Sequence, residues 1–152
     1  MNDNDTAMRA HAATNPMPEF DDPAFVKPRP LSEATVAIVT SAALHTTGDT
    51  GWGPNADPQF KVLASADRSL QLAHFSPNFD RAGYAADINV VYPIDRLNEL
   101  AADGIIGAVA PNHYAFAGNQ DETVSGIRLD TGPRAAKLII DDGVDIVLLT
   151  PV

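Results

Sequence analysis

The sequence contains no cysteine among its 152 residues. Disulfides, thiolate zinc sites and a thiol nucleophile are therefore excluded within these residues. Basic residues are also scarce, with ten Lys and Arg against twenty Asp and Glu, which gives a formal net charge of -10 at pH 7. Nucleic acids and anionic membranes attract a basic face, which this composition does not supply, so we predict neither as a partner.

Long apolar runs are missing as well. No stretch approaches the roughly 20 apolar residues that are needed to cross a bilayer. The first residues, Met1 to Thr14, are polar and lack the apolar segment of a signal peptide. We therefore expect a cytoplasmic protein. What is present is ordinary for one globular domain, because 45% of the residues are hydrophobic.

Proline is concentrated at the N-terminus. Five of the twelve prolines lie within the first 30 residues, namely Pro16, Pro18, Pro23, Pro28 and Pro30. Proline fixes φ and removes a hydrogen-bond donor, so neither a helix nor a strand is expected to propagate there. We predict that residues 1–30 form a flexible tail, with an arm lying on a neighbouring subunit as the alternative. Residues 31–152 then form the folded domain.

The first strand is expected at Ala34–Ser41, a short β-branched apolar run that is typical of a strand buried on both faces of a parallel sheet. Residues 42–59 are rich in glycine and proline and predict a long loop. Two further strands are expected at Phe60–Ser65 and Leu70–Phe75.

Two later blocks each place a helix before a strand. A helix beginning at Pro93 is followed, after a glycine, by an expected strand at Ile105–Ala110, and a helix beginning at Pro133 is followed by one at Val144–Leu149. This alternation predicts an α/β fold with a partial doubly wound, mostly parallel sheet, Rossmann-like or flavodoxin-like. Two helices are few for a sheet that needs cover on both faces, so we expect the fold to be incomplete at the C-terminus.

Three histidines follow the expected strands: His45, His74 and His113. Ligands of such folds bind beyond the carboxyl ends of the strands, so these side chains could meet on one rim and transfer protons there. Asp80 is an acidic candidate for the same site. A loop histidine that is hydrogen-bonded to the backbone is the alternative for any one of the three.

Three residues are weaker candidates for binding a substrate. Asp87 and Asn89 precede an apolar pair of valines, and both residue types equally form turns. Arg96 could hold a substrate carboxylate, or could pair with Glu99 or Asp103. No metal site is predicted.

Several stretches taken together resemble a known family. They are ATVAIVTSAALH (Ala34–His45), His74 with Asp80, DINVVYPIDRLNEL (Asp87–Leu100), GIIGAVAPNHYAFAG (Gly104–Gly118) and GVDIVLLTPV (Gly143–Val152). In order and spacing they look like the selenoprotein B family of the glycine, sarcosine and betaine reductases and the related D-proline reductase subunit. The resemblance covers roughly residues 34–152, while residues 46–59 and 119–132 match poorly.

The resemblance also implies which residue would follow the C-terminal Val152. In that family, the residue directly after a run like Leu149–Val152 is typically selenocysteine, or cysteine in its place. Selenocysteine is encoded by UGA, which is normally read as a stop. We therefore hypothesise that the sequence is truncated at its own active-site codon, so that the nucleophile is expected directly after Val152. These 152 residues alone would then be inactive.

The resemblance also implies the chemistry of an oxidoreductase. A selenolate would attack a carbon of glycine, sarcosine, betaine, proline or a similar amine and displace the nitrogen, because the anion is the nucleophile. No cofactor is expected in this chain itself. A partner subunit would carry a pyruvoyl group, thiol proteins would supply reducing equivalents, and the protein would be an oligomer. His45, His74, His113 and Asp80 are the candidates to protonate the leaving amine or stabilise the anion.

Two other function classes stay open at this point. The first is a non-catalytic α/β subunit for binding or assembly in a reductase complex, which would fit the absence of a nucleophile. The second is a small metal-dependent hydrolase that uses His74, Asp80, Asp87 and His113, although their spacing matches no specific metal motif. The substrate itself is not determined by these residues, since function is set by the site and not by the fold.

Overall fold

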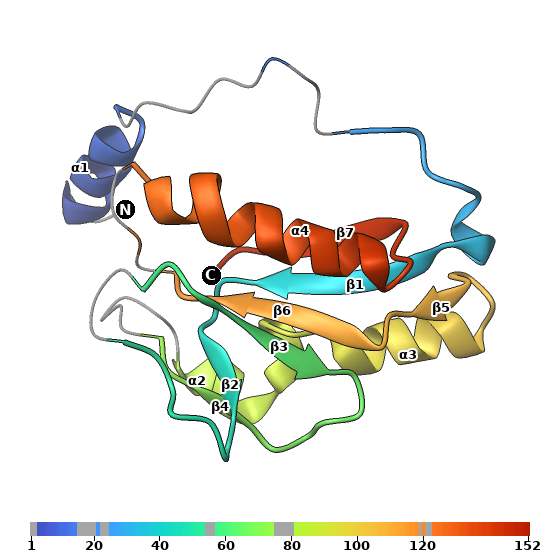
Figure 1. The fold of residues 1–152 in the computed structure, drawn as a ribbon. Helices are drawn as coiled ribbons and strands as arrows, with labels where there is room; N and C mark the ends of the chain where they lie inside the picture. The colour runs from blue at the N-terminus through green and yellow to red at the C-terminus, as the bar shows by residue number, and fades with distance from the viewer. Residues whose placement is uncertain are drawn as a thin grey trace.

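The computed structural model describes residues 3–14, 21, 25–53, 57–74, 81–118, 120 and 123–152. They form the predicted α/β architecture, with one five-stranded, mostly parallel sheet and a separate two-stranded ribbon (Figure 1). The elements are α1 Asp3–Ala12, η1 Leu31–Glu33, β1 Thr35–Thr40, β2 Leu44–Thr46, β3 Phe60–Ala64, β4 Leu70–Leu72, α2 Arg81–Ala86, η2 Ile88–Val90, α3 Ile94–Ala102, β5 Ala108–Val109, β6 Asn112–Phe116, η3 Ile127–Thr131, α4 Gly132–Asp141 and β7 Ile146–Thr150.

Strand β1 is the centre of the sheet. One of its edges pairs in parallel with β7 over Val36–Thr40, and its other edge pairs in parallel with β5 and then with β6. Val36 and Ile38 are buried almost completely. The apolar, β-branched sequence of this segment is therefore explained by its central position, and the strand expected at Ala34–Ser41 is confirmed.

Strands β5 and β6 follow the same edge of β1, but their register changes on the way. Thr35 is opposite Ala108, whereas Val39 is opposite Tyr114, so two extra residues are accommodated between the two pairings. Pro111 lies in this interval, and proline has no N–H to donate to a ladder. The interruption creates the environment of His113, which is described below.

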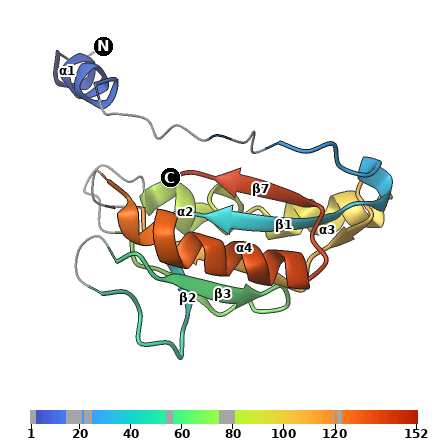
Figure 2. The ribbon, with the colours of Figure 1, turned by 45° about the horizontal axis from the view of Figure 1, so that its top comes forward.

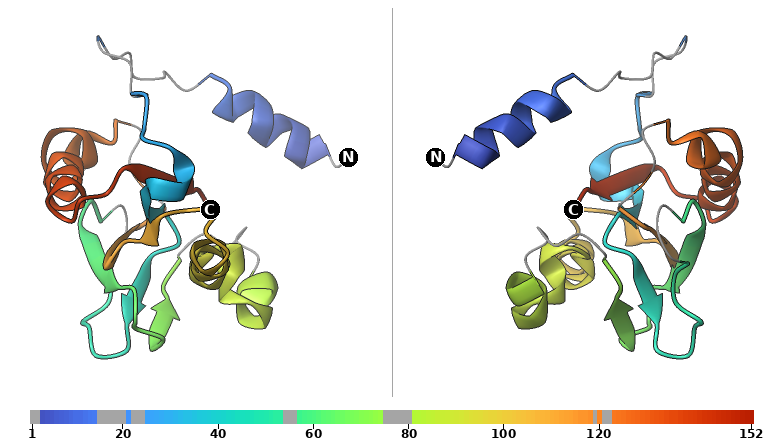
Figure 3. Two further views of the ribbon diagram at one scale, coloured as in Figure 1. Left: turned by 90° about the vertical axis from the view of Figure 1, so that its right-hand side faces the viewer. Right: turned by 90° about the vertical axis from the view of Figure 1, so that its left-hand side faces the viewer.

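Helices cover both faces of the sheet. The face of Val36 and Ile38 packs on η2 and α3, where Ile94 and Leu97 are buried. On the other face, α4 lies over the β3 and β6 side of the sheet, with the Arg134 guanidinium 5.7 Å from the centre of the Phe60 ring (Figures 2 and 3). Strand β7 lies at the other edge of the sheet.

Several elements differ from the sequence predictions. Strand β2 lies inside the predicted loop 42–59, and no strand was predicted for the segment that forms β6. Both strands depend on pairing with segments distant in sequence, since β2 pairs with β4 and β6 with β1 and β3. Their own sequences are short and partly polar, so they carry little local signal.

The prediction that no helix forms in the N-terminal segment was wrong. Helix α1 spans Asp3–Ala12 and stands apart from the sheet (Figures 2 and 3). The reason is that all five prolines of the segment follow the helix, beginning at Pro16. Arg9 and His11 lie in the last turn, where positive charge interacts favourably with the helix dipole.

Candidate functional site

The carboxyl ends of β1, β6 and β7 meet around a small pocket. Its lining consists of Val39, Thr40, Ser41, Phe116, Leu149, Thr150 and Pro151. Because β1 and β7 are parallel and in register from Val36 to Thr40, the two strands end side by side. This is the edge at which open α/β sheets bind their ligands.

Two threonines fix the ends of β1 and β7 to the layer beneath them. The Oγ1 atoms of Thr40 and Thr150 both donate to the carbonyl oxygen of Val91, each at 2.9 Å. Thr40 Oγ1 also accepts the N–H of Ala42 at 3.2 Å, which shapes the turn after β1. Both strand ends are therefore anchored to the chain between η2 and α3, and the edge of the pocket is rigidly placed.

Ser41 extends the pairing of β1 and β7 beyond the strands themselves. Its N–H donates to the carbonyl oxygen of Thr150 at 3.3 Å. Pro151 then has no N–H to offer, and the side chain of Ser41 takes over: its Oγ accepts the N–H of Val152 at 2.8 Å. Val152 is thereby held beside the end of β1.

Gly118 marks a point where four segments converge. A Cβ atom added there would lie 2.8 Å from His74 Nε2, 2.9 Å from the Ser41 carbonyl oxygen and 3.2 Å from the Val152 carbonyl oxygen. Two of these separations are closer than real Cβ contacts, so a side chain would have to displace its neighbours. The absence of a side chain at residue 118 therefore lets His74 approach the ends of β1 and β7.

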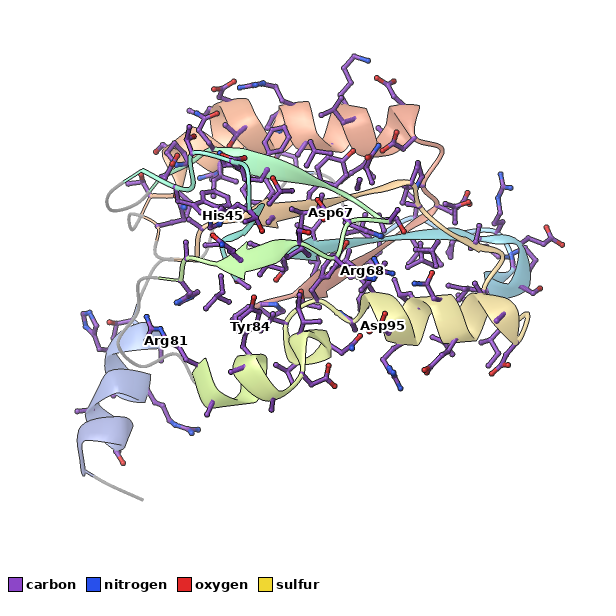
Figure 4. All side chains as sticks on the ribbon, turned by 90° about the horizontal axis from the view of Figure 1, so that it is seen from below. His45, Asp67, Arg68, Arg81, Tyr84 and Asp95 are labelled. Atoms are coloured by element: carbon purple, nitrogen blue, oxygen red, sulfur yellow. The ribbon has the colours of Figure 1, made fainter. Side chains whose placement is uncertain are left out.

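His74 lies two residues beyond the end of the ribbon strand β4 and is 7% exposed. Its backbone carbonyl accepts a hydrogen bond from Arg81 Nη2 at 2.8 Å. Arg81 begins helix α2, so this bond ties the ribbon to that helix. Figure 4 labels Arg81 at the start of the helix and Tyr84 one turn further on. Burial raises the pKa of Tyr84 above its usual range, so its hydroxyl is protonated at neutral pH.

His45 occupies a different place. It lies in β2, opposite Gln71 of β4, and is 8% exposed. Its Nε2 lies 3.8 Å from the position of a Cβ placed on Gly51, so the ring faces the loop after β2. Its Nδ1 is buried and has no hydrogen-bond partner among the described residues.

His113 lies in the core. It is within β6 and fully buried, so the expected rim position for this residue was wrong. Its Nδ1 accepts the N–H of Ile38 at 2.9 Å, and its ring meets Tyr92 edge-on with the ring centres 5.4 Å apart. Burial, aided by the positive charge of Arg68, lowers the pKa of His113 to about 4. The residue is therefore a neutral imidazole at pH 7.

The weaker candidates have local partners. Asp87 caps η2 by accepting the backbone N–H and the side-chain amide of Asn89, at 2.9 and 2.8 Å. Both hydrogen bonds lower the pKa of the Asp87 carboxyl, and the bond from the backbone of Asn89 has the larger effect. The guanidinium of Arg96 lies 2.9 Å from the carboxylate of Glu99 on the exposed side of α3. Asp87 and Asn89 thus shape a local turn and Arg96 pairs with Glu99, which are the structural alternatives that the sequence left open.

The remaining acidic candidate, Asp80, lies outside the described residues. Within the ranges that the structure describes, no group of three or more His, Cys, Asp or Glu side chains is arranged to hold a metal ion. Asp95 accepts a hydrogen bond from Asn89 Nδ2 at 3.0 Å and lies 4.0 Å from Arg68 Nη2 (Figure 4). No helix in this part of the chain is long and apolar enough to cross a membrane.

Sequence reasoning missed two contributors to the site. Ser41 was expected only as the last residue of a strand, and Gly118 was named only as the last residue of a stretch that resembles the family. Neither contact had a local signal, because Ser41 and Val152 are 111 residues apart. The one available signal was that two apolar strands, β1 and β7, each end on a threonine.

Comparisons with known proteins place the chain among reductase subunits. The family model for "Glycine/sarcosine/betaine reductase selenoprotein B (GRDB)" matches residues 6–152. The match thus begins within α1, in a segment that the resemblance read from the sequence did not cover. No solved structure matches the chain.

Three curated relatives illustrate the similarity. The D-proline reductase subunit gamma of Acetoanaerobium sticklandii is 33% identical over 122 residues, which cover 79% of this chain and 49% of the relative. The sarcosine reductase complex component B subunit beta of Peptoclostridium acidaminophilum is 32% identical over 152 residues, and the glycine reductase complex component B subunit gamma of Carboxydothermus hydrogenoformans is 31% identical over 148 residues. Each of these alignments covers 89% of this chain and 32% of the relative. The chain therefore spans between about a third and a half of the length of the relatives that it matches.

Proposed function

Because this chain belongs to the glycine/sarcosine/betaine reductase selenoprotein B family, we propose that it forms the N-terminal portion of a reductase-complex subunit that cleaves a C–N bond. The substrate class is an amino acid or amine of the kind that glycine, sarcosine, betaine and proline represent. The nucleophile in this proposal is a selenocysteine, or a cysteine, directly after Val152.

The observation that carries the proposal is the position of Val152. Ser41 holds the backbone of this residue beside the end of β1, next to the small pocket between the strand ends. A residue bonded to Val152 would therefore start at the ligand-binding edge of the sheet. The pocket lining consists mainly of the apolar parts of Val39, Phe116, Leu149 and Pro151. An apolar surface of this kind suits the carbon skeleton of a small amine.

The proposed chemistry balances as a displacement followed by a reduction. The selenolate forms a bond to the substrate carbon, the C–N bond breaks, and the nitrogen leaves with the bonding pair and takes up a proton. The Se–C bond is then cleaved by two electrons from a thiol protein, which is oxidised to a disulfide. The carbon leaves with a proton in place of the nitrogen, and the selenolate is restored. A pyruvoyl group on a partner subunit would activate the amino substrate. No residue of this chain is assigned to binding the pyruvoyl group.

The coding DNA beyond the codon of Val152 provides the first test. We expect UGA followed by a continuous open frame, or a cysteine codon in that position. A UAA or UAG codon, or the absence of a downstream frame, would contradict the assigned nucleophile. That outcome would favour the alternative, a non-catalytic α/β subunit of the same complex.

Activity provides the second test. The full-length subunit, made with selenocysteine and combined with its complex partners and a dithiol, is expected to release amine or ammonia from one of glycine, sarcosine, betaine or proline. Replacing the residue after Val152 with serine should abolish the release, because the hydroxyl is not ionised at neutral pH. Unchanged release by the serine variant would refute the proposed mechanism.

A further inference from the structure

We propose that His74 is the histidine that exchanges a proton with the chemistry at the residue following Val152, and that Gly118 is needed to keep the two within reach. The identity of that residue as the nucleophile rests on the proposed function. The placement of His74 rests only on the geometry of the described residues.

His74 and Val152 both border the space that the missing side chain of Gly118 leaves, here called the Gly118 gap. His74 Nε2 and the Val152 carbonyl oxygen lie 2.8 and 3.2 Å from the same point in space, the Cβ position of residue 118. The carbonyl carbon of Val152 is bonded to the nitrogen of the next residue at about 1.33 Å. The next residue therefore begins close to the Gly118 position, which His74 Nε2 also borders.

Four strand ends build this volume. Ser41 follows β1, His74 follows β4, Gly118 follows β6 and Val152 follows β7. Both Ser41 and Val152 present carbonyl oxygens toward the Gly118 gap. His74 Nε2 thus places a hydrogen-bonding ring nitrogen near the point where an anionic side chain would lie.

A donor in this position can act twice in the proposed reaction. It can donate a hydrogen bond to the selenolate or thiolate before the attack, which stabilises the anion. It can then give its proton to the leaving nitrogen, which keeps the electron pair of the broken C–N bond. His74 is nearly buried but Val152 is 41% exposed, so the imidazole can be reprotonated from water through the open end of the site.

The other two histidine candidates do not have this placement. His113 uses Nδ1 to hold the Ile38 N–H inside the core. His45 turns its Nε2 toward Gly51. Arg81 donates a hydrogen bond from its guanidinium to the backbone carbonyl of His74 and not to its ring.

A reporter thiol tests the inference directly. In the full-length subunit, with cysteine placed after Val152, the rate of alkylation by iodoacetamide is measured across pH. We expect His74→Gln to raise the apparent pKa of this thiol and to slow its alkylation at pH 7, by about tenfold for one pKa unit. His45→Gln, the competing candidate, should leave the profile unchanged.

A reciprocal measurement separates a charge interaction from a structural role. The pKa of His74, followed by NMR, should fall when the reporter thiolate is converted to a neutral thioether. The fall should equal the rise of the thiol pKa in His74→Gln, since coupling between two sites is reciprocal. This measurement keeps His74 intact, so it decides the question even if the His74→Gln variant unfolds.

Gly118→Ala tests the gap itself. The new Cβ would displace His74 or Val152, so this variant should slow alkylation as His74→Gln does. Gly48→Ala is the matched control, because no atom of the described residues lies within 4 Å of a Cβ at that residue. The inference is overturned if His74→Gln leaves the alkylation profile unchanged while His74 keeps one pKa before and after alkylation, or if His45→Gln shifts the profile equally. Because the reporter needs no reductase activity, these outcomes are distinct from failure of the proposed function.

Discussion

At the scale of single residues, His113 shows how a polar side chain can be required inside a core. The backbone groups of Val36 and Ile38 face the edge of β1 that β5 and β6 follow, and Val36 accepts the N–H of Ala110 at 2.9 Å. The two extra residues between β5 and β6 break the regular pairing at Ile38. His113 Nδ1 then accepts the Ile38 N–H at 2.9 Å, in place of a ladder carbonyl. A buried N–H without a partner would cost about 1–3 kcal/mol.

We predict that His113→Leu destabilises the fold and also changes how stability depends on pH. At pH 7 the variant should lose about 1–3 kcal/mol of unfolding free energy, because the Ile38 N–H is left unpaired. The pKa of His113 is about 4 in the folded protein, below the ordinary 6.5. Between these values the unfolded chain binds a proton that the folded one does not. Its contribution to stability is therefore complete above pH 6.5 and is lost as the pH falls toward 4.

Urea unfolding at pH 7 and pH 5 measures both effects. The wild-type protein should lose about 2 kcal/mol more on going to pH 5 than His113→Leu does. His11→Leu, a change of the same residue type in the exposed part of α1, is the control and should alter neither quantity. Parallel pH dependence in wild type and His113→Leu would show that His113 is not held neutral by the core.

At the scale of elements, one carboxylate links the C-terminal end of α4 to the sheet. Asp142 caps the C-terminus of α4, where the helix dipole disfavours negative charge. It is held there by two donors from β6: Tyr114 Oη at 3.0 Å and Asn112 Nδ2 at 3.1 Å. Burial raises the pKa of Tyr114, and the neighbouring Asp142 carboxylate raises it further. The Tyr114 hydroxyl therefore stays protonated and donates.

We predict that Asp142→Ala loosens α4 from β6. The two donors lose their common acceptor, so the unfolding free energy should fall by about 1–3 kcal/mol, and amide exchange in α4 should quicken. Asp141→Ala is the matched control, since that carboxylate pairs with Lys137 on the exposed surface and such pairs contribute about 0.3–0.5 kcal/mol. Equal losses in the two variants would argue against the Asp142 contact.

The elements also differ in how far they could be predicted. The strands β1 and β7 and the helices α3 and α4 were predicted because each carries a strong local pattern: an apolar β-branched run, or a proline start with spaced apolar residues. Strand β6 was missed because its segment, NHYAF, mixes polar and aromatic residues and forms a strand only between β1 and β3. Helix α1 was missed because the prediction treated the whole proline-rich segment as one unit. The ten residues of the helix itself contain no proline.

At the scale of the whole molecule, apolar surface is exposed along β7. Leu149 is 67% exposed, and Val147 and Leu148 are 37% and 38% exposed. Among the described strands, β7 pairs only with β1, so its second edge presents unpaired backbone groups. Such an edge next to apolar side chains favours association with other chains or dyes.

We predict that residues 1–152, expressed alone, bind a hydrophobic dye, and that Leu149→Lys lowers the dye fluorescence. The lysine places a charge in the exposed patch on an edge strand, a position where charge is well tolerated. Glu99→Lys, which changes an exposed residue on α3, is the control and should leave the fluorescence unchanged. A sharp cooperative melt of a monomer that binds no dye would contradict this prediction.

The sequence by itself determined the α/β class, the central strand β1 and the family, because apolar runs, proline and glycine placement and the ordered motifs are properties of local segments. Only the tertiary structure decided which histidine lies where. His45, His74 and His113 each follow or lie near an expected strand, so spacing along the chain does not distinguish them. Their positions depend on the register change between β5 and β6 and on the gap at Gly118. Both features arise from pairing between segments far apart in sequence, and their energies belong to the assembled sheet.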